Sequence, residues 1–426
     1  MTFSTALQLS NRQVSIQAAG RFLIQICYGL ITFYIPILFV NKMGFSATAV
    51  GFALSLCAVA EVAGHFISGG LSDSPQFGRK AVLSLSAGLG VAASGVLLIA
   101  HSLWLLVIAR LILGISIGLY WPASGAAVID VTESEDCSSA FAVMSVAESV
   151  GTGLGILGGG ALLTVVGGDP TLVFVGCGII FLVFLALIQG AMVEEYQPSA
   201  SSDAVDGIVS ALKDKTLLMF IVTNTLFTTY VALITSTIPL YFTNFLAGDG
   251  TASGVSVGST ASLFTWCYIG VGAVLQIPTT SLLLPLRRIW VLSSAIALWG
   301  TGFALLWVAG IFVEAQFVWA AAALCLLSLA SVVYKPLFIA TVADLAPAPL
   351  RGAYLAVSSQ CWTLGYFIGP TLGGWAMDQS VVMARHFWLE VAASSVLCMV
   401  LLWVFEAARM RTPLQVAKAE LSVKAG

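Results

Sequence analysis

Charged residues are scarce in this sequence of 426 residues. Asp, Glu, Lys and Arg make up only 9% of it, whereas about a quarter of a soluble globular domain is charged. Hydrophobic residues make up 59%, and the mean hydropathy is +1.01. The formal net charge of −3 does not suggest nucleic-acid binding. These values are typical of a protein whose surface faces lipid, so we expect a lipid bilayer around it and no nucleic-acid partner.

Sequence features of enzymes and of nucleotide-driven machines are also missing. No GxxxxGK loop is present, so ATP is not the expected direct source of energy. The eight cysteines include no CxxC pair, and we interpret them as small residues that face lipid or the protein core. His101 and His386 fall near outer helix ends, away from any pattern typical of a metal or nucleophile site. We therefore expect a protein that is not an enzyme and that holds no metal and no cofactor.

Long apolar runs, by contrast, are abundant. They fall at about 17–41, 47–70, 80–100, 103–129, 138–166 and 170–193, and then at about 216–246, 255–284, 289–310, 315–343, 352–378 and 386–408. Each run can cross the ~30 Å hydrocarbon core as a helix. We predict an all-α membrane protein with 12 transmembrane helices in two six-helix bundles. The N-terminal bundle is expected at 1–193, a polar cytoplasmic linker at 194–215, and the C-terminal bundle at 216–426.

Basic residues predict the orientation. The polar N-terminus lacks a cleavable signal pattern, and an even number of spans places both termini on one side. With a cytoplasmic N-terminus, 12 of the 17 basic residues are cytoplasmic, and only Lys42 and Arg385 lie outside. The other three, Arg21, Arg110 and Lys335, fall within apolar runs. The positive-inside rule thus predicts a multi-pass protein of the plasma membrane or bacterial inner membrane, with both termini in the cytoplasm.

The two halves of the sequence repeat each other. LITFYIPILFVN at 30–41 matches LITSTIPLYFTN at 233–244, with Leu, Ile, Thr, Ile, Pro, Phe and Asn in register. An offset of 214 carries Tyr120, Pro122 and Asp130 onto Tyr334, Pro336 and Asp344, and it carries Gly151, Gly155, Gly159 and Gly160 onto Gly365, Gly369, Gly373 and Gly374. Two parallel halves related along the membrane normal are a transporter architecture, with the substrate site between them near the midplane.

Three short motifs of the sequence carry a family resemblance. GGLSDSPQFGRK at 69–80 resembles the signature loop Gly-x-Leu-Ala-Asp-Arg-x-Gly-Arg-Arg/Lys of the major facilitator superfamily, with two residues inserted and Ser74 in place of a basic residue. RLILGISIG at 110–118 is similar to the arginine–glycine motif of proton-coupled members. GYFIGPTLGG at 365–374 has the form of the antiporter motif of drug exporters, but that motif belongs in span 5, where Ile156 replaces the proline. The resemblance covers essentially the whole chain and implies transport by rocking of the two halves.

The signature loop also predicts a gate latch at the cytoplasmic ends of the helices. Asp73 at the end of span 2 is expected beside the N-terminus of span 11, its neighbour in the family, where the helix dipole favours a negative charge. Small residues there let the helices approach closely, and Arg79 or Lys80 is expected to pair with Asp130. The gating set is Gly69, Asp73, Gly78, Arg79, Lys80, Asp130, Asp344 and Arg351. The alternative is that Arg79 and Lys80 serve only to anchor the topology.

Ionisable residues within the spans are candidates for proton coupling, because a charge at membrane depth is costly. Glu61 and His65 lie one turn apart on one face of span 2, and either proton exchange or a structural hydrogen bond would explain them. Glu148 falls about half-way through span 5. Arg110 resembles the motif arginine that influences nearby acids in the family. Lys335 is expected to bind a substrate anion or to neutralise Glu148 or Glu61.

Aromatic and amide side chains of spans 1, 4, 7 and 10 are expected to line the substrate cavity. Together with Lys335 they are Gln25, Tyr28, Tyr34, Tyr120, Trp121, Asn224, Tyr230 and Tyr334. As a set they suit a bulky, partly apolar ligand. We predict a secondary transporter, monomeric and driven by protons, that exports amphipathic or lipophilic small molecules. The alternative is proton-coupled uptake of a small organic anion or other polar metabolite, favoured by Arg110 and Lys335 and by the missing proline of span 5.

Overall fold

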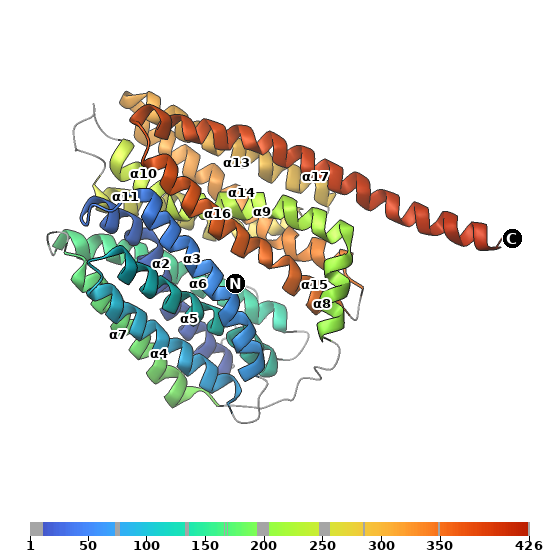
Figure 1. Ribbon diagram of the computed structural model, residues 1–426, viewed down its shortest axis with the longest axis horizontal. Coiled ribbons are helices and arrows are strands. Elements are labelled where there is room, and N and C mark those ends of the chain that lie inside the picture. Colours follow the sequence, from blue (N-terminus) through green and yellow to red (C-terminus); the bar gives the residue numbers. More distant parts are fainter. Residues whose placement is uncertain are drawn as a thin grey trace. The chain divides into compact units, whose positions relative to one another are not determined.

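The computed structural model describes residues 12–72, 77–132, 136–165, 167, 169–193, 204–246, 256–283, 286–347 and 350–424. Within these ranges the regular structure is helical throughout, so the all-α prediction is confirmed (Figure 1). The first helices are α2 (Arg12–Asn41), α3 (Ala47–Ser72), α4 (Gly78–Leu98), α5 (Leu103–Asp130), α6 (Cys137–Val165), α7 (Thr171–Ala191) and α8 (Ala204–Lys213). They are followed by α9 (Lys215–Ser236), α10 (Ile238–Phe245), α11 (Val257–Phe264), α12 (Val271–Leu283), α13 (Arg288–Ile311), α14 (Gln316–Leu345), α15 (Arg351–Ser358), α16 (Gln360–Met377) and α17 (Val381–Lys424).

Eleven of the described helical segments are long and apolar enough to cross a membrane. The one predicted span that is not among these eleven is span 11, at 352–378, which consists of α15 and α16 adjoining at Ser359. The seventh span is interrupted as well, because α9 ends at Ser236 and α10 begins at Ile238, next to Pro239. Proline lacks the N–H that would continue the hydrogen-bond ladder, so the helix restarts there.

By its internal contacts the chain divides into two compact units. The first comprises residues 1–200, 232–273 and 366–384, and the second comprises 201–231, 274–365 and 385–426. Parts of spans 7, 8 and 11 thus belong with α2–α7 in the first unit. The division into bundles at 1–193 and 216–426 follows the sequence repeat and stays a prediction.

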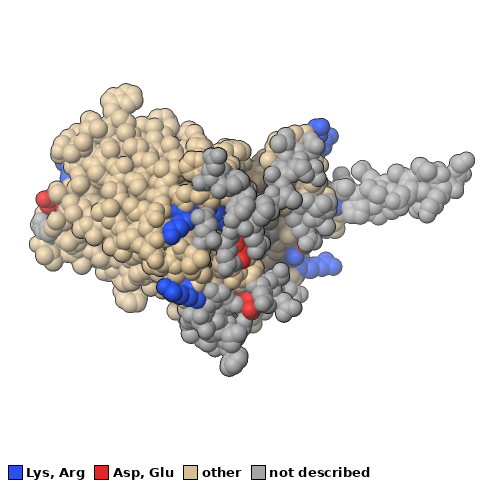
Figure 2. Space-filling model, turned by 90° about the horizontal axis from the view of Figure 1, so that it is seen from below, with Lys and Arg blue, Asp and Glu red and all other residues tan. Residues whose placement is uncertain are grey.

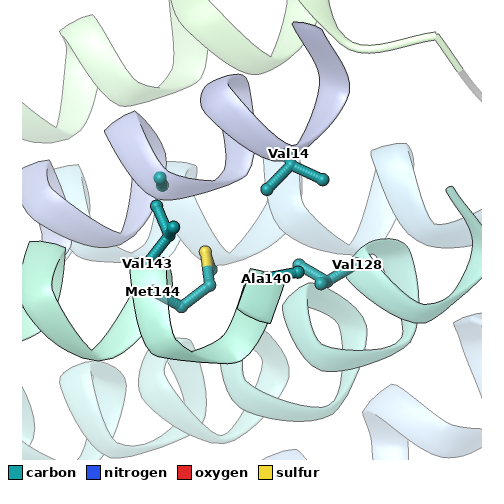
Figure 3. Packing of buried hydrophobic residues seen from close by; sticks show 6 residues of the cluster. Val14, Val128, Ala140, Val143 and Met144 are labelled. Carbon is teal, nitrogen blue, oxygen red and sulfur yellow. The ribbon is translucent and has the colours of Figure 1, made fainter. Parts of the chain in front are cut away.

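In the first unit, α3 packs against α5, α2 against α6, and α4 against both α5 and α7. Figure 3 shows one buried cluster, in which Val14 and Ala18 of α2 meet Val128 of α5 and Ala140, Val143 and Met144 of α6. Lipid is as apolar as these side chains, so close van der Waals packing rather than escape from water holds them together. The cluster joins the start of α2 and of α6 to the end of α5.

The second unit has an aromatic core. The rings of Phe227 and Tyr334 stack with their centroids 4.7 Å apart, and Trp299 packs 5.1 Å from Phe227. Tyr230 lies against Trp299 at 5.7 Å. Such ring pairs add to the stabilisation that burial alone provides, so α9, α13 and α14 are held together by this core.

The surface carries few charges, as the composition requires. Figure 2 shows one face on which uncharged residues predominate and the blue and red groups are few. Many large apolar side chains are exposed, including Trp104, Phe66 and Trp266. A surface of this kind fits a lipid environment.

Candidate functional site

A buried arginine of α2 organises a polar cluster within the first unit. Arg21 is only 5% exposed. Its Nε donates to the Tyr120 hydroxyl at 3.0 Å, one Nη donates to Ser124 Oγ at 3.4 Å, and the other lies 3.4 Å from Glu148 Oε2. The guanidinium also sits 4.1 Å from the ring centroid of Trp121, within range of a cation–π interaction. We call Arg21, Tyr120, Trp121, Ser124 and Glu148 the Arg21 cluster.

Glycines of α6 bring Glu148 to Arg21. A side chain at Gly151 would overlap the backbone oxygen of Phe22, and one at Gly155 would overlap that of Ile26. The backbones of α6 and α2 therefore approach closely, as small residues permit between membrane helices. One turn further along α6, Thr152 Oγ1 donates to Gln25 Oε1 at 3.2 Å, which continues the polar contact beyond Glu148.

The ion pair is unequally exposed. The Arg21 side chain is 6% accessible, whereas that of Glu148 is 32% accessible. The cation is thus fixed inside the helix bundle, and the carboxylate is the member that a proton or a cationic ligand can reach. An unpaired charge at this depth would be costly, and each member provides the other's counter-charge.

Glu61 and His65 form a second polar pair on α3. His65 Nε2 lies 3.8 Å from Glu61 Oε1, one helical turn away, as the sequence predicts. Gly118 of α5 would overlap the backbone oxygen of Glu61 if it carried a side chain, and Gly114 would overlap that of Cys57. The glycines of the arginine–glycine motif therefore hold α5 against α3 next to Glu61.

Arg110 begins that motif and is 5% exposed. Among the residues that the structure describes, its Nε and one Nη have no hydrogen-bond partner. A buried guanidinium with unused donors is an available site for an anion or a carboxylate.

At the side where α2 begins, basic residues in the first turn of α4 bond to the ends of other helices. Arg79 pairs with Asp130 and donates to the backbone oxygen of Ala126 at 2.9 Å, so this predicted contact is confirmed. Lys80 instead donates to the backbone oxygens of Gln189 and Met192, each at 2.9 Å, at the C-terminus of α7, where a cation is favoured. The latch function of these contacts stays a prediction.

The other members of the predicted gate differ in outcome. Gly78 adopts a positive φ of 67° at the start of α4, which a glycine accommodates without strain. A Cβ atom added to Gly69 would have no described atom of the first unit within 4 Å. The close packing of helices that we predict at Gly69 is therefore not found within the described part of this unit. Asp73 and the side chain of Arg351 lie outside the described residues.

The second unit repeats the Arg79 arrangement with a different arginine. Arg288 pairs with Asp344 and donates to the backbone oxygen of Ala340 at 2.6 Å, and Arg409 lies 3.5 Å from the same carboxylate. Ala340 and Asp344 are the repeat counterparts of Ala126 and Asp130. The two halves thus use the same device at the same place.

The residues predicted to line a cavity fall into four groups. Tyr120 and Trp121 belong to the Arg21 cluster, and Gln25 accepts from Thr152, whose hydroxyl also donates to the backbone oxygen of Glu148. Tyr34 is fully buried and donates to the backbone oxygen of Ile156, where it fills the space beside Gly159, so it packs α2 onto α6.

In the second unit, Asn224 accepts from the Tyr334 hydroxyl at 2.9 Å and Tyr230 bonds Ser394 at 2.8 Å, so the three residues tie α9 to α14 and α17. Tyr28 is half-buried and Lys335 is exposed.

Two functional candidates were not predicted from the sequence. Arg21 received no role there, although it is a charge inside an apolar run, the signal that singled out Arg110 and Lys335. Arg288 was counted only as a topology residue, although the repeat of Asp130 in Asp344 required a basic partner from the loop before span 9.

Residues 18–265 match the family model of the Major Facilitator Superfamily. The chain belongs to this superfamily. It is 23% identical over 385 residues to the multidrug resistance protein MdtH of Klebsiella pneumoniae, across 87% of this chain and 88% of that protein. It is 25% identical over 359 residues to MdtH of Shigella boydii, across 81% of each chain.

Two solved transporter structures share the fold. The nucleoside transporter NupG matches with a TM-score of 0.76 at 12% identity, over 93% of this chain and 98% of that one. The POT family transporter PepTSo matches with a TM-score of 0.75 at 12% identity, over 94% and 99%. At such identities the likeness is one of fold alone. As a superfamily member the chain is a multi-pass membrane transporter for small molecules, which points away from an enzyme.

Proposed function

We propose that this protein is a proton-driven exporter of amphipathic or lipophilic small molecules that works by alternating access. The observation that carries the proposal is the Arg21–Glu148 ion pair, an exchangeable charge inside a transmembrane bundle. The similarity to multidrug resistance proteins over more than four fifths of the chain supports the export of such substrates. The predicted placement of both termini in the cytoplasm belongs to the same proposal.

In this mechanism Glu148 exchanges a proton for a cationic or polarisable substrate. While Glu148 is ionised, Arg21 neutralises it at 3.4 Å. Protonation removes that attraction, but Tyr120, Ser124 and the Trp121 ring keep the guanidinium in place. The carboxylate is then free to turn toward the accessible side, and its charge state is coupled to the position of α6 relative to α2.

Collapse of a pH gradient tests the driving force. Purified protein in proteoliposomes with an imposed gradient should concentrate a lipophilic cation such as ethidium, and a protonophore should abolish the accumulation. Glu148→Gln should still bind and exchange ethidium but fail to accumulate it, whereas Glu314→Gln, at an exposed position between α13 and α14, should transport normally. Accumulation by Glu148→Gln equal to that of the unaltered protein would refute the assignment.

Uptake of a small organic anion is the second candidate function. The unused Arg110 donors favour it, as does the exposed ammonium of Lys335. Lys335→Ala should then abolish the binding of anionic ligands alone. Unchanged anion binding by both Lys335→Ala and Arg110→Met would remove this candidate.

A further inference from the structure

The carboxylate of Asp378 caps a helix that is distant in sequence. Asp378 follows the last residue of α16, and its Oδ1 accepts from the backbone N–H of Ala47 at 2.7 Å. Its Oδ2 accepts from the backbone N–H of Thr48 at 2.8 Å and from the Thr48 hydroxyl. These N–H groups open α3, where a helix leaves donors unpaired and the dipole favours a negative charge. The start of α3 and residues 366–384, which include the end of α16 and Asp378, belong to the first unit.

The flank of α3 provides a weaker cap of its own. Ser46 Oγ accepts only from the N–H of Ala49, at 3.2 Å, among the contacts of the described residues. The related start of α11 has a local cap of the same kind, because Ser256 Oγ of its flank accepts from Ser259 N at 3.1 Å. The start of α3 has the Asp378 carboxylate in addition, which another span brings to it.

Close packing of the two helices positions this cap. A side chain at Gly51 would overlap the backbone oxygen of Pro370, and one at Gly374 would overlap that of Ala47. One turn beyond Gly51, the hydroxyls of Ser55 and Thr371 bond at 2.8 Å. We call this contact between α3 and α16 the 47–378 crossing.

A repeat-related contact lacks the acid. Gly160 of α6, the counterpart of Gly374, packs against Ala261 and Gly258 near the start of α11. Four residues after Gly160 stands Thr164, at the place that Asp378 holds after Gly374. The charge is thus not required to build a helix contact of this kind.

A second polar contact lies on the same side of the bundle. Asn41 at the end of α2 and Asn244 of α10 donate to each other's side-chain oxygens at 2.7 and 2.9 Å. Behind it a cavity of about 10 Å³, at the lower limit for one water molecule, is lined by Pro36, Val40, Leu54 and Leu240 among others. This cavity is too small to hold a substrate.

We propose that Asp378 is the residue that holds the transporter closed on the side opposite its termini. The 47–378 crossing is then the counterpart, at the other end of the same helix pair, of the latch predicted for Asp73. Opening to that side separates α16 from α3 and removes the carboxylate from the Ala47 and Thr48 N–H groups. The proposal rests on the proposed alternating access and on the predicted orientation.

Thiol labelling tests the proposal without a substrate. Ser55→Cys places a reporter under the crossing, where the side chain is fully buried. The full-length protein in sealed vesicles of known orientation is treated with a membrane-impermeant maleimide, and labelling of protein without the reporter is subtracted. Adding Asp378→Asn should raise the labelling rate from the side opposite the termini about tenfold, which corresponds to about 1.4 kcal/mol.

Asp169→Asn is the matched control. Asp169 is also an acid beside a helix start, but among the described residues its hydrogen bonds go to Thr171, two residues away, whose backbone N lies at 2.9 Å. It should leave the rate within twofold of the parent. Thr48→Val, which removes one donor and keeps the carboxylate, should raise the rate less than Asp378→Asn does, and it provides the test if Asp378→Asn does not fold.

An equal rate in Asp378→Asn and the parent, or equal increases in Asp378→Asn and Asp169→Asn, would overturn the proposal. Labelling only from the side of the termini would overturn it too, because the crossing would then face the cytoplasm. Neither result depends on ethidium accumulation, so a failed latch and a failed export function are distinguishable.

Discussion

Removal of the Arg21 guanidinium should destabilise the protein more than loss of the Glu148 charge does. Arg21→Met keeps a long apolar side chain but leaves a carboxylate at membrane depth without its partner, along with two hydroxyls that lose a donor. Breaking a fully buried pair in this way costs about 3–5 kcal/mol. Since the Glu148 side chain is 32% accessible, part of that cost is relieved by solvent, and we expect roughly 2–3 kcal/mol. Glu148→Gln retains a hydrogen-bond acceptor, and the guanidinium that loses its counter-charge keeps Tyr120, Ser124 and the Trp121 ring as partners, so this change should cost about 1 kcal/mol.

The double variant decides whether the two side chains act as a pair. With both charges removed no unpaired carboxylate remains, so Arg21→Met with Glu148→Gln should cost about 1–2 kcal/mol less than the sum of the single changes. The free energy of unfolding is measured by denaturant titration of each purified variant in the same detergent.

Arg110→Met combined with Glu148→Gln serves as the control, and this pair should be additive within about 0.5 kcal/mol. Additivity of the Arg21 and Glu148 changes would refute a direct interaction and, with it, the site on which the proposed coupling depends.

Three further outcomes are expected. Gly118→Ala should destabilise the protein by about 1–3 kcal/mol, because the added methyl group overlaps a backbone oxygen of α3. Gly125→Ala on the same helix, where the glycine has open space around it, should be nearly neutral in the same unfolding titration. Exchanging the charges of Arg79 and Asp130 should restore transport partly relative to either single change; no recovery in a vesicle assay would favour the topology-anchor role. Asp73→Asn should insert normally but transport poorly, and near-normal ethidium accumulation would exclude the predicted cytoplasmic latch.

Much of the fold could be predicted because its signals repeat. The alignment that matches Gly151 to Gly365 and Gly159 to Gly373 also matches the contacts that these glycines make. Gly151 packs against Gln25 and Gly365 against Thr228, and Gly159 packs against Tyr34 and Gly373 against Thr237. The alignment of 30–41 with 233–244 has an offset of 203, and the same offset relates Gln25 to Thr228 and Tyr34 to Thr237. The repeat therefore records real helix–helix contacts in both halves.

The partner of Glu148 could not be predicted in the same way. In a soluble helix the polar stripe shows which face is buried, but here both the lipid-facing and the protein-facing sides are apolar, so the pattern does not reveal helix rotation. The sequence identified Glu148 and Lys335 as charges at depth without showing which residue meets which. The α2–α6 contact that pairs Glu148 with Arg21 depends on backbone approach at Gly151 and Gly155. The repeat marks these two glycines, but it does not show which residues of α2 they meet.

Asn41 and Asn244 bear on how the fold arose. They hold the same place in the repeat, and a residue that meets its own counterpart lies on the axis that relates α2 to α10. In a symmetric dimer, such a self-contact belongs to an isologous interface, in which one patch binds a copy of itself. A chain of half this length, with six spans, would therefore make the same bond by pairing with a second copy. Asparagine suits that position, because its amide both donates and accepts, so two identical side chains satisfy each other where two aspartates or two lysines would repel.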